Sequence, residues 1–171
     1  MTFIEYQNDS RRTCPTIGHV SLWTKFKHLF VKDDNFHTSL DIAHMVLGIN
    51  SEINELQDAL TVRDDVNLSE EIADVHWYIS NLCRFRGYDY DTMSSTFSQV
   101  YNRIGYNTAS LVLIMYREVS LLQDVVKKDI AYGKQVKGEV EHLSKLCWAL
   151  QMLADRKNIS IYSKQYLSLH I

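Results

Sequence analysis

Residues that interrupt helices are scarce in this chain of 171 residues. It has one proline, Pro15, and six glycines, and this shortage favours few turns and long helices. Its three cysteines, at positions 14, 83 and 147, are odd in number and widely separated, which argues against a disulfide framework and for a reducing compartment. The absence of a C-x-x-C pair argues against a structural zinc site.

Long apolar runs and an excess of positive charge are also missing. The longest apolar run, Leu111–Met115, is far too short to span a bilayer. The net charge of −3 gives no attraction to nucleic acid or to an anionic membrane. The first residues lack a basic region followed by an apolar stretch, so no secretory signal is expected. We expect a cytoplasmic protein that binds neither a nucleic acid polymer nor a membrane.

The composition is that of an ordinary globular domain, with 46% hydrophobic and 23% charged residues. The chain is long enough to bury a core, and apolar residues recur at helical spacing. The pattern predicts an all-α bundle of five or six helices within one domain over 19–157. An irregular segment precedes it over 1–18, and a tail follows over 158–171. The predicted helices cover 19–32, 38–62, 68–86, 89 or 91 to 104, 107–130 and 135–156.

Local signals mark several boundaries of these helices. The apolar residues of the first helix are Leu22, Phe26, Leu29 and Phe30, with lysines between them. A loop is expected over 63–66, with Asn67 as the cap of the next helix. Gly87 is expected to end that helix. Residues 159–162 alternate in polarity, which is compatible with a short strand or with coil.

Two pairs of carboxylates are the most informative motif. Glu52-x-x-Glu55 and Glu71-x-x-Asp74 lie in two consecutive predicted helices, and residues three positions apart share a helix face. If these helices pack together, the four carboxylates converge, and their mutual repulsion calls for a cation. Carboxylate oxygens suit a hard ion such as Mg²⁺ or Mn²⁺. Solvated carboxylates on two ordinary helices are the alternative.

The stretch from Asp41 to Gly87 resembles the all-α nucleoside triphosphate pyrophosphohydrolases, which include MazG-like proteins and the dimeric dUTPases and dCTPases. The resemblance is carried by the two carboxylate pairs, by His44 before them and by Asp74-Val-His-Trp-Tyr78, as in phage-type MazG-like proteins. It implies a helical bundle around a metal site, completed by two repeats or two subunits. It also implies hydrolysis of a (d)NTP between the α- and β-phosphates, giving a (d)NMP and pyrophosphate.

The resemblance assigns roles to particular residues. It makes Glu52, Glu55, Glu71 and Asp74 the catalytic residues and the Mg²⁺ ligands, although one glutamate of the first pair could instead orient or deprotonate the attacking water. The candidate substrate-binding residues are His44, Trp77, Tyr78, Asn81 and Arg103. Each has a plainer alternative as a core, backbone-bonded or surface residue. Ser51 departs from the pattern, because many members of the superfamily carry a further glutamate there.

A weak internal repeat is present. Glu52–Asp58 aligns with Glu118–Asp124, and Glu71–Val75 aligns with Glu139–Leu143. In this alignment Leu121 replaces Glu55 and His142 replaces Asp74, so residues 107–157 read as a degenerate copy without the full carboxylate set. If the repeat is real, one chain supplies both halves of the bundle. If it is accidental, a homodimer or higher oligomer is expected.

Two other functions are compatible with the sequence. One is a helical nucleotide-binding or partner-binding module with weak or no catalysis. The other is a ferritin-like di-iron protein, since Glu139-x-x-His142 has the form of ligand pair used in such bundles, with Glu52 and Glu118 from other helices. That fold requires two such motifs, and the chain has one.

Overall fold

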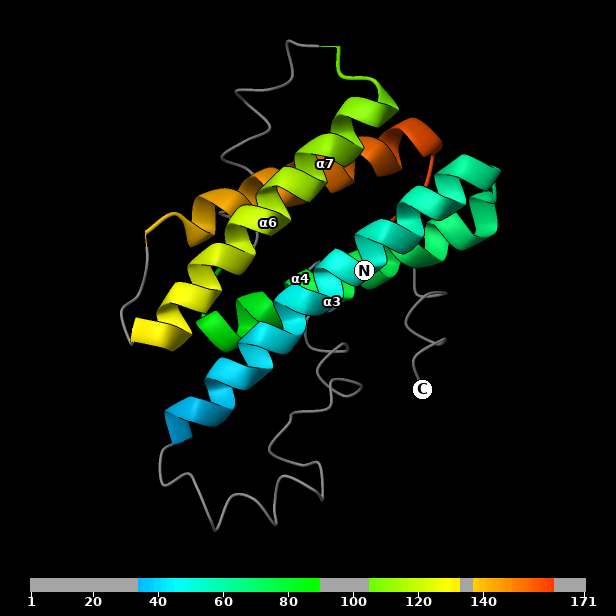
Figure 1. The fold of residues 1–171 in the computed structure, drawn as a ribbon. Helices are drawn as coiled ribbons and strands as arrows, with labels where there is room; N and C mark the ends of the chain where they lie inside the picture. The colour runs from blue at the N-terminus through cyan, green and yellow to red at the C-terminus, as the bar shows by residue number, and fades with distance from the viewer. Residues whose placement is uncertain (1–33, 90–104, 133–136, 162–171) are drawn as a thin grey trace.

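The structure, a computed structural model, describes residues 34–89, 105–132 and 137–161 (Figure 1). These residues form four helices: α3 (Asp34–Val62), α4 (Asp65–Arg86), α6 (Thr108–Tyr132) and α7 (Glu139–Lys157). The described part of the chain contains no strand, so the predicted all-α class is confirmed. The described residues give four helices where five or six were predicted for the whole chain, and the two predicted over 19–32 and up to 104 lie outside these residues.

The four helices form two antiparallel hairpins that pack on each other. α4 turns back along α3, and α7 turns back along α6 (Figure 1). α3 also contacts α6, and α4 contacts α7. Each helix therefore has two neighbours, and the core lies between the two hairpins.

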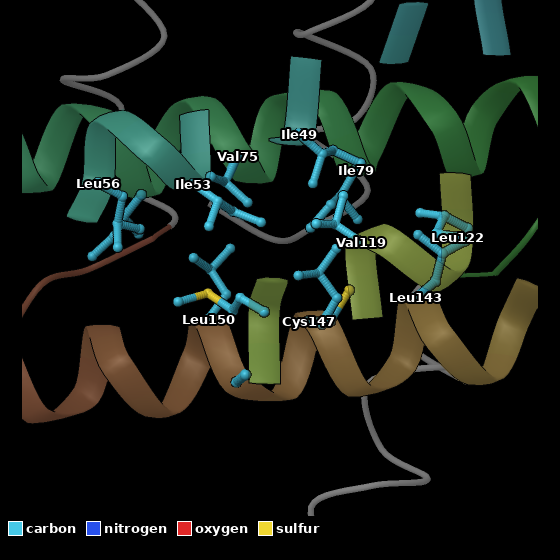
Figure 2. Close-up of a cluster of buried hydrophobic side chains, with 14 of the residues drawn as sticks. Ile49, Ile53, Leu56, Val75, Ile79, Val119, Leu122, Leu143, Cys147 and Leu150 are labelled. Carbon is cyan, nitrogen blue, oxygen red and sulfur yellow. The ribbon is translucent and has the colours of Figure 1, made fainter. Parts of the chain in front are cut away.

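Aliphatic side chains from all four helices meet in this core (Figure 2). Each helix contributes apolar residues at spacings of three and four, which places them on one face. The fully buried examples include Ile49, Ile53, Ile79, Leu122 and Leu150. Burying one such side chain contributes roughly 1.5–3 kcal/mol, so the core fixes how α3 and α4 lie against each other.

The turn between α3 and α4 is shorter than the sequence suggests. The prediction of a loop through Val66 with Asn67 as the cap is wrong, because α4 begins at Asp65 and Asp64 caps it. The Asp64 carboxylate accepts hydrogen bonds from the backbone N–H groups of Val66 and Asn67, both at 3.1 Å. Aspartate is a strong N-cap residue, and here the earlier of the two possible caps is used.

The end of α4 agrees with the prediction. Gly87 has a φ of 68°, and its N–H and that of Tyr88 donate to the carbonyls of Arg84 and Cys83. Glycine adopts this left-handed conformation without steric cost. The predicted stop at Gly87 is confirmed.

The second hairpin begins and ends close to the predicted positions. Helices were expected over 107–130 and 135–156, and the structure has Thr108–Tyr132 and Glu139–Lys157. α7 begins later than predicted because Gly138, with a φ of 107°, stands at its N-terminus. Residues 159–161 form no strand, and residue 162 lies outside the described part. No helix within the described ranges is long and apolar enough to cross a membrane.

Candidate metal centre

Three of the four predicted carboxylates converge where α3 and α4 pack together. One carboxylate oxygen from each of Glu52, Glu55 and Glu71 lies within 4.8 Å of the others. Glu71 is buried, Glu52 is half-buried and Glu55 is exposed, so the cluster reaches from the helix interface to solvent. This is the only such group of ligating side chains within residues 34–89, 105–132 and 137–161.

Asp74 lies next to this group. It is one turn beyond Glu71 on α4, and its charge acts on both Glu52 and Glu71. It is not one of the three residues whose oxygens meet within 4.8 Å. The structure thus brings three of the predicted ligands together and places the fourth close enough to interact electrostatically.

The electrostatics of the cluster show that negative charge is crowded there. Burial, followed by the charges of Asp74 and Glu55 and a hydrogen bond to Glu71, raises the pKa of Glu52 to about 8. Burial also raises the pKa of Glu71, with further contributions from Glu55 and Asp74, while the hydrogen bond with Glu52 opposes the rise. Protonated Glu52 therefore donates a hydrogen bond to the Glu71 carboxylate, and this proton neutralises one charge in the group.

The donor set fits a hard divalent ion. Mg²⁺ takes oxygen ligands at about 2.1 Å, so ligands on opposite sides of one ion are about 4.2 Å apart. The three oxygens lie within 4.8 Å of one another, close enough for small side-chain shifts to bring all three onto one ion. A cation would replace the proton shared by Glu52 and Glu71, and it would neutralise more charge than the proton does.

Next to the carboxylates, α3 and α4 approach closely at Gly48. A Cβ atom at Gly48 would collide with the ring of Tyr78, so only glycine leaves room for this ring. Tyr78 in turn meets His44 edge to face, with ring centroids 6.0 Å apart. The sequence signal for this contact was a glycine inside an apolar helical pattern, which often marks a close packing partner.

The other predicted substrate-binding residues are placed differently. Trp77 is 8% exposed and belongs to the hydrophobic core, with its ring 4.9 Å from that of Tyr78. Asn81 is fully buried, donates to the Trp77 carbonyl at 3.0 Å and accepts from Arg84 at 3.3 Å. Arg103 lies outside the described residues. His44 and Tyr78 are therefore the two candidates that are only half-buried near the carboxylates.

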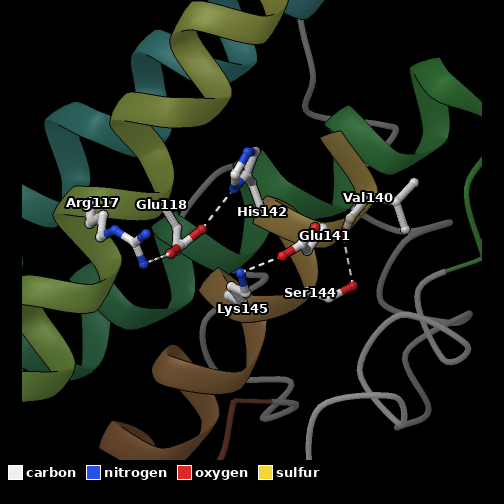
Figure 3. A network of polar contacts seen from close by, with 7 residues as sticks. All are labelled: Arg117, Glu118, Val140, Glu141, His142, Ser144 and Lys145. Atoms are coloured by element: carbon white, nitrogen blue, oxygen red, sulfur yellow. Dashed lines mark hydrogen bonds and ion pairs between the residues drawn. The ribbon is translucent and has the colours of Figure 1, made fainter. Parts of the chain in front are cut away.

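In the second hairpin, the first counterpart of the cluster is neutralised within the protein. Glu118, which aligns with Glu52, is 1% exposed, and its carboxylate lies 2.8 Å from Nδ1 of His142 and 3.0 Å from Arg117 (Figure 3). His142 stands where Asp74 stands in the first half. A basic side chain, His142, thus stands at the position that aligns with the acidic Asp74.

The second counterpart, Glu139, aligns with Glu71 and is 3% exposed. Nε of Arg86 donates to it at 2.8 Å, and the hydroxyl of Tyr88 donates at 3.3 Å. The same guanidinium reaches Asp129 at 2.8 Å. We call Arg86, Tyr88, Asp129 and Glu139 the end cluster. It joins the end of α4 to α6 and α7, and nothing in the sequence pattern predicted it.

Comparisons with protein-family models, with curated proteins and with solved structures found no match to this chain.

Proposed function

We propose that this protein is a Mg²⁺-dependent nucleoside triphosphate pyrophosphohydrolase. It would hydrolyse a (d)NTP between the α- and β-phosphates and release a (d)NMP and pyrophosphate. The observation that carries the proposal is the convergence of Glu52, Glu55 and Glu71 within 4.8 Å, with Asp74 beside them. The resemblance of residues 41–87 to the all-α pyrophosphohydrolases adds the reaction type.

Glu52, Glu55, Glu71 and Asp74 would hold the metal. When bound, Mg²⁺ supplies positive charge against the phosphate oxygens and lowers the pKa of bound water. A glutamate of the first pair, Glu52 or Glu55, would accept a proton from the attacking water. His44 and Tyr78 would contact the nucleoside, because they are the partly exposed aromatic residues next to the cluster.

One alternative keeps the same site without turnover. A nucleotide-binding module with weak or no catalysis would use the same carboxylates, and Ser51 in place of a further glutamate favours it. The di-iron alternative has less support, because Glu139 is paired with Arg86 and His142 with Glu118. Neither residue belongs to a cluster of metal ligands in the described parts of the chain.

The direct test is release of pyrophosphate from a panel of canonical and modified dNTPs and NTPs in the presence of Mg²⁺ or Mn²⁺. At least one nucleotide should be hydrolysed. Glu71→Gln should lower kcat/KM by about a hundredfold or more, since a metal ligand supplies several kcal/mol of charge stabilisation. Asp58→Asn is the matched control, because Asp58 is an exposed acid on α3, three residues beyond Glu55.

The possible results separate the candidate functions. Loss of activity in Glu71→Gln with activity retained in Asp58→Asn supports the hydrolase. Nucleotide binding without release of pyrophosphate from any member of the panel supports the binding module instead. Full activity in Glu71→Gln would show that this cluster does not carry out the reaction.

A further inference from the structure

An apolar groove of about 730 Å³ lies between the first half of α3 and the last turns of α6. α3 contributes Ala43, Val46 and Leu47, and α6 lines the opposite wall between Ser120 and Ala131. Leu47 is 63% exposed and Ile130 on the far wall is 42% exposed. Side chains of this kind gain roughly 1.5–3 kcal/mol when they are covered. No helix of the described part covers this groove.

We propose that residues 19–32 of the same chain bind this groove as an amphipathic helix antiparallel to α3. The apolar residues of this segment are Leu22, Phe26, Leu29 and Phe30, spaced for one helix face. This interaction is separate from the proposed catalysis, so neither stands or falls with the other.

The short connection to α3 supports residues 19–32 as the segment that binds the groove. α3 begins at Asp34, so residues 19–32 join the bundle at the end where the groove lies. So short a connection between two helices favours antiparallel neighbours. At 1.5 Å per residue, 14 helical residues cover about 21 Å, which matches α3 from Asp34 to Gly48. In this register Leu22 lies beside His44 and Met45, within one helical turn of Val46 and Leu47.

The groove suits one helix better than the other candidates. Residues 90–104 must connect α4 to the start of α6, and these points lie at opposite ends of the bundle (Figure 1), whereas the groove is confined to one end. A second copy of the chain needs about 800 Å² of surface on each partner for a stable interface. The groove is bounded by a few residues of two helices, so its size suits the four apolar side chains of residues 19–32 better than the interface of a dimer.

Disulfide trapping in the full chain tests the proposal. In a Cys14→Ser background, Cys83 and Cys147 remain buried, and one variant carries Leu22→Cys with Leu47→Cys. The matched control carries Leu22→Cys with Leu113→Cys. Leu113 is as exposed as Leu47, at 68%, but it lies far from the groove: it is 14 residues, or about 21 Å, along α6 from Lys127, which lines the groove. Circular dichroism of the reduced variants verifies that both have folded.

Mild oxidation should form an intramolecular cross-link at Leu47 about tenfold faster, or more, than at Leu113, because a docked segment has a high local concentration. A parallel pair with Phe26→Cys in place of Leu22→Cys allows for a shift of one turn. Three results would overturn the proposal. The first is formation of disulfide-linked dimers through Leu47→Cys. The second is faster cross-linking of Leu47→Cys to Phe97→Cys, which lies within residues 90–104, than to Leu22→Cys or Phe26→Cys. The third is an equal rate of cross-linking at Leu47 and at Leu113.

A stability measurement gives an independent answer. Phe26→Asp should lower the melting temperature and increase binding of a hydrophobic dye, because the groove would lose an apolar partner. Lys27→Asp, on the neighbouring polar position, should change neither quantity appreciably. Equal effects of the two substitutions would contradict the docked segment.

Discussion

The two helical hairpins differ in the partners of their buried acidic side chains. In α3 and α4, carboxylate oxygens of Glu52, Glu55 and Glu71 lie within 4.8 Å of one another, and this crowding, together with burial, raises the pKa of Glu52 to about 8. In α6 and α7, Glu118 and Glu139 are more deeply buried, yet each is paired with a base of the same chain. A charge that is neutralised internally contributes to the fold, whereas a crowded group of like charges costs stability until a ligand neutralises it. This contrast is why we place the proposed function in the first hairpin alone.

The largest effect on stability should come from removing the base of the end cluster. Arg86→Met leaves Glu139 and Asp129 without their shared cation, and breaking a buried pair in this way costs about 3–5 kcal/mol. Denaturant unfolding followed by circular dichroism measures the loss. Arg117→Met is the control, because Arg117 is 69% exposed and its buried partner Glu118 keeps the contact with His142 at 2.8 Å. The expected loss is about 1 kcal/mol or less. If Arg86→Met lowers the free energy of unfolding no more than Arg117→Met does, the acids of the second hairpin do not depend on their buried basic partner.

Adding Mg²⁺ should stabilise the protein through the first hairpin only. At a free concentration about a hundred times its Kd, the ion adds about 2.7 kcal/mol to the free energy of unfolding. Thermal melts with Mg²⁺ and with a chelator measure this difference. Glu71→Gln should remove most of the shift and Glu118→Gln should keep it. An undiminished shift in Glu71→Gln would place the ion elsewhere.

The shared proton should make the metal-free protein less stable as pH rises. The pKa of Glu52 is raised from 4.5 to about 8, so its contribution is fully present below pH 4.5 and is lost between 4.5 and 8. Burial lowers the pKa of His76 from 6.5 to about 3, which acts in the opposite direction as pH falls below 6.5. Above pH 6.5 the contribution of His76 is constant, so the fall in stability between pH 6.5 and 8 reports the raised pKa of Glu52 together with that of its neighbour Glu71. In chelator, wild-type stability should fall across this window and Glu52→Gln should flatten the curve. Equal slopes would contradict the shared proton.

The smallest effect concerns the close approach beside the cluster. Alanine is favoured over glycine in a helix by roughly 0.5–1 kcal/mol, but a Cβ at Gly48 would collide with the Tyr78 ring. Overpacking of this kind costs typically 1–3 kcal/mol, so Gly48→Ala should destabilise by about 1 kcal/mol net. In a Tyr78→Ala background the same substitution should stabilise, which a double-mutant cycle in urea measures. The same sign in both backgrounds would show that the ring does not set the preference.

The local features of the fold were predictable because they depend on near neighbours in the sequence. The spacing of apolar residues predicts the helices that the structure shows, and Gly87 predicts the end of α4. The cap at Asp64 was missed because the sequence also offers Asn67 three residues later, and local preference alone does not choose between them.

The site was predictable only in part. The two carboxylate pairs each share a helix face by their spacing, but their convergence depends on the register in which α3 packs on α4. That register is set by the core and by Gly48 meeting Tyr78. The pairing of Arg86 with Glu139 joins residues 53 positions apart, and no periodic pattern in the sequence predicts such a contact.

The pairing of Glu118 with His142 has a consequence for how this chain can change over time. His142→Asp would bring an acid to the position that aligns with Asp74, but it would set this acid against the buried Glu118 carboxylate, which would keep only the exposed Arg117 as a basic partner. Forming a second cluster would also require a change at Arg86, which joins the end of α4 to α6 and α7. Each single step passes through a less stable protein, so the difference between the two hairpins resists change. Once a buried acid has acquired its own base, the fold itself comes to depend on that pair.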